Sequence, residues 1–109
     1  MKKENIIKNN KEIQEILNTK CATVGSNFIV YKKENHDERT RFAISVSKKF
    51  GNAVKRNQIK RRVRAIVDQN KYKNYDVFVI IRPRAKSLNF DEINKELNSL
   101  FLEAKILED

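Results

Sequence analysis

The spacing of apolar side chains predicts seven secondary-structure elements. Apolar residues recur every three or four positions in three stretches, as is typical of amphipathic helices. These helices are expected in a short segment capped by Asn10, from about Asn52 to Gln69, and from Asn89 or Asp91 onward. Apolar or alternating segments of strand length lie between them, at residues 21–24, 27–33, 39–47 and 76–82. The predicted order is helix, three strands, helix, strand, helix.

This order predicts an α+β fold, a two-layer sandwich with an open, mixed four-stranded sheet. Residues 76–82 are almost wholly apolar, which indicates a central strand. A long helix separates this strand from residues 39–47, so the two strands are expected to be parallel neighbours. The length of 109 residues leaves room for a single domain over residues 1–109. Residues 1–8 are basic and polar, and we expect a flexible arm there.

The middle helix is predicted to have an apolar seam with cations beside it. Apolar residues of this helix fall at helical intervals, at Val54, Ile59, Val63, Ile66 and Val67, and the last four share the one arc that forms the seam. Two polar rows run beside the seam, with Arg56, Lys60 and Arg64 in one row and Asn57 and Arg61 in the other. Gly51 and Asn52 supply a turn and an N-cap, so the rows begin at a helix N-terminus, whose free N–H groups favour an anion.

Positive charge is concentrated around this helix. The chain has 24 Lys and Arg against 14 Asp and Glu, a formal net charge of +10. Eight cations and no carboxylate lie between residues 48 and 64: Lys48, Lys49, Lys55, Arg56, Lys60, Arg61, Arg62 and Arg64. Like charges repel unless an anion offsets them, so we expect this face to bind phosphate. Structured RNA is favoured over DNA because no helix-turn-helix or zinc-finger pattern is present.

Other chemistries have weak support in the sequence. No apolar run reaches membrane-spanning length and the first residues lack a signal-peptide core, so a cytoplasmic location is expected. Cys21 is expected to be a small, half-buried strand residue, and His36 a solvated loop residue. Asp37 and Glu38 would make only a weak metal-binding pair. No catalytic triad or glycine-rich phosphate loop is present.

The run from Ser45 to Arg64, SVSKKFGNAVKRNQIKRRVR, resembles the signature of the bacterial ribonuclease P protein subunit. The resemblance continues in NFIVY at residues 27–31 and in the apolar strand that ends in Arg82-Pro83. It implies a protein that joins a catalytic RNA in the endonucleolytic removal of the 5′ leader from precursor tRNA. It also implies that the RNA holds the active site and most of the Mg²⁺, with no catalytic or metal site and no obligatory protein partner for this chain. The crossover through the basic helix would be left-handed.

Carried over by position, the resemblance implies two binding surfaces. The residues expected to bind the catalytic RNA are Lys48, Lys49, Asn52, Arg56, Asn57, Lys60, Arg61 and Arg64. The residues expected to bind the leader lie between the first helix and the sheet: Ile13, Leu17, Phe28 and Tyr31. Gln58 departs from the family, which often has a third basic residue there. Ile13 and Leu17 stand where relatives commonly have Phe, and aliphatic side chains cannot stack on bases as rings do.

Two other functions stay open at this point. One is a ribosome-associated or other structured-RNA-binding protein that assists folding without cleavage. The other is a stand-alone nuclease, which would need acidic side chains converging on one site and activity without RNA. The RNA that co-purifies, and leader removal on adding the protein to the catalytic RNA at low magnesium, would distinguish them.

Overall fold

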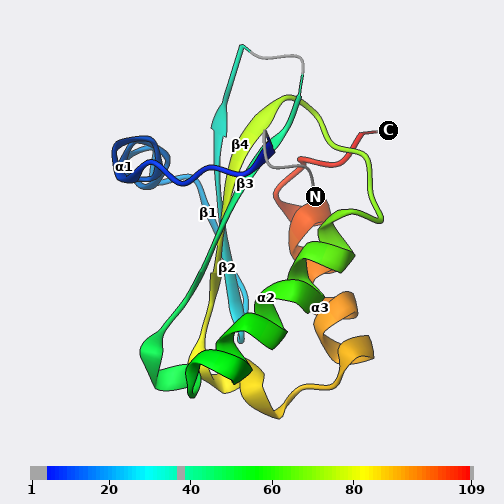
Figure 1. Ribbon diagram of the computed structural model, residues 1–109. Coiled ribbons are helices and arrows are strands. Elements are labelled where there is room, and N and C mark those ends of the chain that lie inside the picture. The colour runs from blue at the N-terminus through cyan, green and yellow to red at the C-terminus, as the bar shows by residue number, and fades with distance from the viewer. Residues whose placement is uncertain (1–4, 37–38, 109) are drawn as a thin grey trace.

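A computed structural model describes residues 5–36 and 39–108 of the chain. Its elements are α1 (Asn10–Asn18), β1 (Ala22–Val24), β2 (Phe28–Glu34), β3 (Arg41–Val46), the 3₁₀ turn η2 (Lys48–Phe50), α2 (Ala53–Val67), β4 (Tyr75–Ile81), the 3₁₀ segment η3 (Pro83–Ser87) and α3 (Phe90–Glu103). One open sheet carries α2 and α3 on one face and α1 against one end of the other (Figure 1). The predicted α+β order is confirmed.

The four strands form a mixed sheet in the order β1-β2-β4-β3. β2 is antiparallel to β1 and to β4, whereas β3 and β4 are parallel. The apolar strand is therefore central, and its parallel pairing with β3 through the α2 crossover is as predicted. The left-handed sense that the resemblance implies for this crossover stays a prediction.

The main core lies between the sheet and the two long helices. α2 buries Ile59, Val63, Ile66 and Val67, and α3 packs its own apolar stripe against the same core. Val54 also falls at a helical interval, but it lies outside this seam and its side chain is 75% exposed. Five residues before Ile59, Val54 lies about 140° around the helix from the seam.

The N-caps of the three helices lie at or next to the residues predicted to cap them. The Asn52 side chain accepts a hydrogen bond from the Lys55 amide at 3.0 Å, as predicted. Asn89 and Glu92 cap α3 reciprocally, with hydrogen bonds of 2.9 and 3.0 Å. α1 differs by one residue, because its cap is Asn9 and not Asn10. α2 ends at Val67, two residues before the predicted end, a difference typical of frayed helix ends.

The N-terminal segment adds to the sheet edge. The Ile7 amide donates to the Phe42 carbonyl of β3 at 2.7 Å, and the Ile7 side chain is only 5% exposed. Ile6 forms an isolated parallel bridge with Phe42. Within the segment where a flexible arm is expected, Ile6 and Ile7 thus pair with β3, and Ile7 buries its side chain. Residues 1–4 lie outside the described part, so the arm stays a prediction.

Two further expectations concern loops. Cys21 is exposed and precedes β1, so its prediction as a half-buried strand residue was wrong. The strand begins one residue later, and the Cys21 amide is near the Thr19 hydroxyl, at 3.3 Å. His36 is exposed, as expected of a solvated loop residue. Asp37 and Glu38, the weak metal-binding pair, lie outside the described residues.

Candidate nucleic-acid interface

Polar and cationic side chains occupy both flanks of α2 and much of its outer surface, where Val54 and Ala65 are also exposed. With 100° between successive residues, Arg56, Lys60 and Arg64 follow one flank of the buried seam. Asn57 and Arg61 lie on the outer surface, opposite the seam. Lys55, Gln58 and Arg62 follow the other flank. The packing seam and the cations therefore occupy separate faces of one helix.

The cations of residues 48–64 are not neutralised by the carboxylates of the described chain. The ion pairs found there join Arg41 to Glu12 and Asp76, and Lys33 to Glu15. None of these pairs involves a cation of α2 or η2. The Arg56 side chain donates to the Gly51 carbonyl at 3.3 Å, and this neutral acceptor leaves the charge of Arg56 intact. This surface can therefore attract a polyanion.

Positive charge also gathers at the N-terminal end of α2. Lys48 and Lys49 lie in η2, directly before this end, and the Ser47 side chain accepts from the Lys49 amide at 3.1 Å. The first turn of α2 contains no acidic residue. Because free N–H groups at a helix start also carry partial positive charge, the lysines and the helix end act in the same direction.

A second surface forms where α1 meets the sheet. Ile13, Leu17 and Tyr31 are partly buried and pack on a small core that includes Ile16 and Phe78. The structure thus brings together three of the four residues predicted to bind the leader. Their exposed portions line the junction between α1 and β2.

Phe28, the fourth of these residues, does not belong to this surface. It is fully buried at 0% exposure and packs in the main core with α3 residues such as Leu97. Side chains three positions apart in a strand point to opposite faces, so Phe28 faces α2 and α3 while Tyr31 faces α1. The assignment of Phe28 to the leader surface is corrected on this ground.

A hollow joins the two surfaces. It has a volume of about 270 Å³, and its lining includes Lys8 of the N-terminal segment, Ile13 of α1, and Lys60 and Arg64 of α2. Ile13 was predicted to bind leader, whereas Lys60 and Arg64 were predicted to bind the catalytic RNA. The two predicted surfaces therefore meet at this hollow, which residue spacing alone does not indicate.

The sheet face beside α1 also carries a row of residues that the sequence analysis missed. Val24, Ile29, Ile80 and Ser45 are aligned across β1, β2, β4 and β3. α1 covers only one end of this face (Figure 1), and Val24 is 65% exposed. Alternation along β2 puts Ile29 on the same face as Tyr31, but the register with the other strands was needed to find the row.

The described residues offer neither a cluster of metal-binding side chains nor a helix able to span a membrane. Among residues 5–36 and 39–108, no group of three or more His, Cys, Asp or Glu side chains is placed to hold a metal ion. No helix in that part of the chain combines the length and the apolar character needed to cross a membrane.

Comparison with known proteins gives consistent matches over nearly the whole chain. A family model described as Ribonuclease P matches residues 1–105. The ribonuclease P protein component of Mesoplasma florum is 43% identical, with 92% of this chain and 94% of that protein covered. A Staphylococcus aureus RNase P protein mutant with defective mRNA degradation activity gives a TM-score of 0.90 at 35% identity, over 96% and 92% of the two chains. The RNase P protein from Thermotoga maritima gives 0.81 at 26% identity, over 94% and 97%.

Proposed function

The chain belongs to the ribonuclease P protein family, and we propose that it is the protein subunit of a ribonucleoprotein that removes the 5′ leader from precursor tRNA. In this proposal the partner RNA holds the active site. The protein binds that RNA with α2 and binds the leader in the groove between α1 and the sheet. Since the reaction matures tRNA, the proposed location is the cytoplasm.

One observation carries the RNA-binding part of the proposal. The cations of residues 48–64 lie on a helix whose apolar seam is buried, and within the described chain they have no carboxylate partners. A folded protein that holds like charges together without offsetting them suits a polyanionic partner. The proposed contacts to the catalytic RNA are Lys48, Lys49, Asn52, Arg56, Asn57, Lys60, Arg61 and Arg64.

The leader is proposed to follow the junction of α1 and the sheet. Tyr31 offers a half-exposed ring for a base, with Ile13 and Leu17 as apolar neighbours. The hollow lined by Lys60 and Arg64 opens beside Ile13, so a strand could pass from this groove toward α2. Because the catalytic RNA is proposed to cleave the precursor, a leader bound in the α1 groove has to reach the RNA bound on α2, and the hollow connects these two surfaces.

Magnesium is assigned mainly to the partner RNA. Magnesium prefers oxygen ligands, usually carboxylates combined with phosphates and waters. Among the described residues no cluster of three or more metal-binding side chains was found, and the groove and α2 are predominantly apolar and basic. The protein's proposed contribution is to position and neutralise phosphates near the ions.

The test is leader removal by the catalytic RNA at limiting magnesium, with and without the protein. Restoration of cleavage on adding the protein is expected. The variant with Arg56→Glu, Lys60→Glu and Arg61→Glu should lose RNA association and restoration while keeping a native circular dichroism spectrum, because these side chains lie outside the buried seam. A matched control with Lys71→Glu, Lys73→Glu and Lys95→Glu makes the same change in charge away from α2, and should retain most of the activity.

The outcomes separate the alternatives. Unchanged RNA affinity in the α2 variant with a native fold would refute the assignment of this face. If the protein binds structured RNA but never restores leader removal, an RNA-folding function is favoured. Cleavage by the protein without RNA would instead support a stand-alone nuclease.

A further inference from the structure

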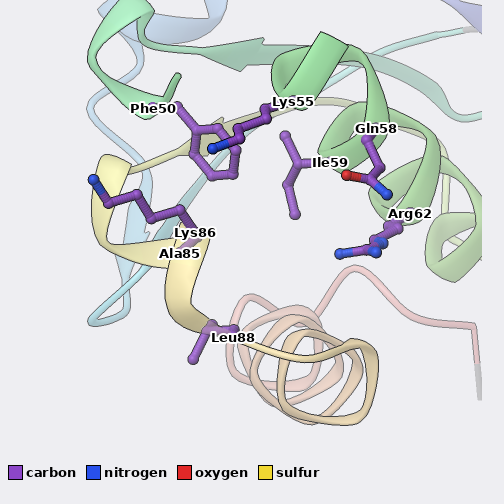
Figure 2. Close-up of a pocket in the computed structure, with 8 residues that line it drawn as sticks. All are labelled: Phe50, Lys55, Gln58, Ile59, Arg62, Ala85, Lys86 and Leu88. Atoms are coloured by element: carbon purple, nitrogen blue, oxygen red, sulfur yellow. The ribbon is translucent and has the colours of Figure 1, made fainter. Parts of the chain in front are cut away.

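The far flank of α2 faces a second hollow. It lies between α2 and η3, has a volume of about 230 Å³ and is called here the α2–η3 hollow. Its lining contains Lys55, Gln58, Ile59 and Arg62 of α2, with Phe50, Ala85, Lys86 and Leu88 opposite or beside them (Figure 2). None of the residues proposed above to bind the catalytic RNA or the leader is in this lining.

The floor of the α2–η3 hollow is apolar. Phe50, Ile59 and Ala85 are 6%, 3% and 0% exposed, so they are held in place by the main core. Leu88 is partly buried and packs against the same core. A floor fixed in this way can receive the flat face of a ligand without rearrangement of the backbone.

The rim is cationic. Lys55 and Lys86 are exposed and Arg62 is partly exposed, and none of the eight lining residues is acidic. No ion pair in the described chain involves these three cations. In Figure 2 the Arg62 side chain points toward the space between α2 and η3, and Lys55 extends beside Phe50. An anion with a flat apolar part therefore complements this site in both charge and shape.

The volume of the α2–η3 hollow limits the size of the ligand that it can hold. Pockets for drug-sized molecules usually measure about 300–1,000 Å³, so the α2–η3 hollow suits a smaller group. A nucleobase with its phosphate is such a group, because a base can stack on an apolar surface or a guanidinium plane while lysine or arginine binds the phosphate.

We propose that the α2–η3 hollow binds one unpaired nucleotide of RNA. The base lies against Ile59 and Leu88 with the Arg62 guanidinium over it, and the phosphate lies between Lys55 and Lys86. This inference rests on the proposed function only in naming the partner RNA as the source of that nucleotide. RNA would then contact both flanks of α2, across the outer surface that carries Asn57 and Arg61.

The nucleotide site can be tested without the catalytic RNA. The isotope-labelled full chain is titrated with adenosine 5′-monophosphate and with a short oligoadenylate, and backbone amide shifts of Gln58, Arg62, Ala85 and Lys86 are followed. Both ligands should shift these amides in a saturable way. Inorganic phosphate and an oligoglutamate peptide serve as comparison ligands and should act more weakly.

Variants separate the site from general electrostatic attraction. Lys55→Glu with Arg62→Glu should weaken oligoadenylate binding at these amides by about fivefold or more, the lower range of a lost stacking contact. Lys71→Glu with Lys95→Glu changes the charge equally elsewhere and should have a smaller effect. Gln58→Arg adds a cation to the rim and should strengthen binding.

Three results would overturn the proposal. They are the absence of shifts at these amides, equal shifts with phosphate or oligoglutamate, and equal weakening by the two charge-reversal pairs in natively folded protein. Because these measurements use no catalytic RNA, their failure is distinct from a failure to restore leader removal. Binding to the catalytic RNA gives a further measurement. With Gln58→Arg, the slope of the logarithm of the association constant against the logarithm of salt concentration should steepen by about 0.7 to 0.9.

Discussion

The Arg41 guanidinium binds both carboxylate oxygens of Asp76. Its Nε lies 3.0 Å from Oδ1 and its Nη2 lies 2.8 Å from Oδ2, between adjacent residues of β3 and β4. The same Nη2 lies 2.7 Å from a carboxylate oxygen of Glu12 in α1. Hydrogen bonding to Asp76 raises the pKa of Arg41, so this side chain stays charged. The pair therefore links α1 to the sheet face that forms the proposed leader groove.

Asp76→Ala should destabilise the protein. Asp76 is 5% exposed and also accepts from the Asn35 side chain at 2.8 Å, so its removal leaves polar groups without their partner. Breaking a buried pair costs about 3–5 kcal/mol, and partial exposure of Arg41 lowers our expectation to about 2–3 kcal/mol. Urea denaturation followed by circular dichroism measures this loss.

The exposed ion pair of Lys33 and Glu15 provides the control for Asp76→Ala. Its atoms are 3.4 Å apart, and its side chains are 39% and 47% exposed. Lys33→Ala should therefore cost less than about 1 kcal/mol. Equal losses for Lys33→Ala and Asp76→Ala would show that the Arg41 pair is no more important than a surface contact.

Truncation of two apolar residues of α2 should change the free energy of unfolding by very different amounts. Val54→Ala should leave the free energy of unfolding within about 0.5 kcal/mol, because the side chain is exposed. Ile66→Ala should cost about 2–5 kcal/mol, because Ile66 is 0% exposed in the main core. Chemical denaturation of both variants tests whether the packing seam of α2 is confined to its buried residues. A large loss for Val54→Ala would place that residue in a packed interface after all.

Leu17→Phe should strengthen leader binding. The half-buried Leu17 packs beside Tyr31 in the groove, and a ring there could stack on a base. Stacking on an aromatic side chain is worth about 1–3 kcal/mol per base, and we expect the lower end, about a fivefold gain in affinity. The measurement compares precursor tRNA with the same tRNA lacking its leader, in the complex with the catalytic RNA. A gain that is equal for both tRNAs would argue against a leader contact at this position.

Stability should fall at high pH through Tyr72. Its hydroxyl donates to the Val67 carbonyl at 2.7 Å, and its ring packs edge-on against Phe42 and Phe101. Burial, aided by the nearby Asp68 charge, raises the pKa of Tyr72 from 10.0 to about 12. The folded chain thus keeps the phenolic proton to higher pH than the unfolded chain, so stability present below pH 10.0 is lost as the pH rises toward about 12.

Tyr72→Phe isolates this effect. The variant lacks the titrating group and one hydrogen bond, so it should be less stable than the wild type at neutral pH. Lysine deprotonation affects both proteins, so the test is the difference between their free energies of unfolding on either side of the titration range. That difference should shrink at high pH; a constant difference would contradict the assigned cause.

Local spacing predicted much of α2, the helix proposed to bind RNA. Ile59, Val63, Ile66 and Val67 are buried as expected, because the helical period determines which residues share a face wherever the helix docks. The same period places Val54 away from this seam, and its side chain is exposed. Lys55 and Arg62 were counted among the cations, but nothing in their spacing indicated that η3 would lie opposite them.

The proposed leader surface was predicted only in part. Alternation along the strand puts Tyr31 and Phe28 on opposite faces, yet it could not tell which face of β2 would meet α1. The docking of α1 through Ile16 decided this, and Phe28 became a core residue. The burial of Ile7 was likewise decided by tertiary packing, because Ile7 docks on the edge of β3, which lies about a third of the chain away in the sequence.

By itself, the sequence determined the order of the elements, the buried seam of α2 and the accumulation of cations along that helix, because these follow from neighbours within one or two turns. Only the tertiary structure decided that Arg41 would bind Asp76 and Glu12, that Ile13 and Arg64 would line one hollow, and that η3 would close another. Each of these contacts joins residues that are more than twenty positions apart in the sequence. Such contacts depend on how helices and strands pack, which the period of a single element does not specify.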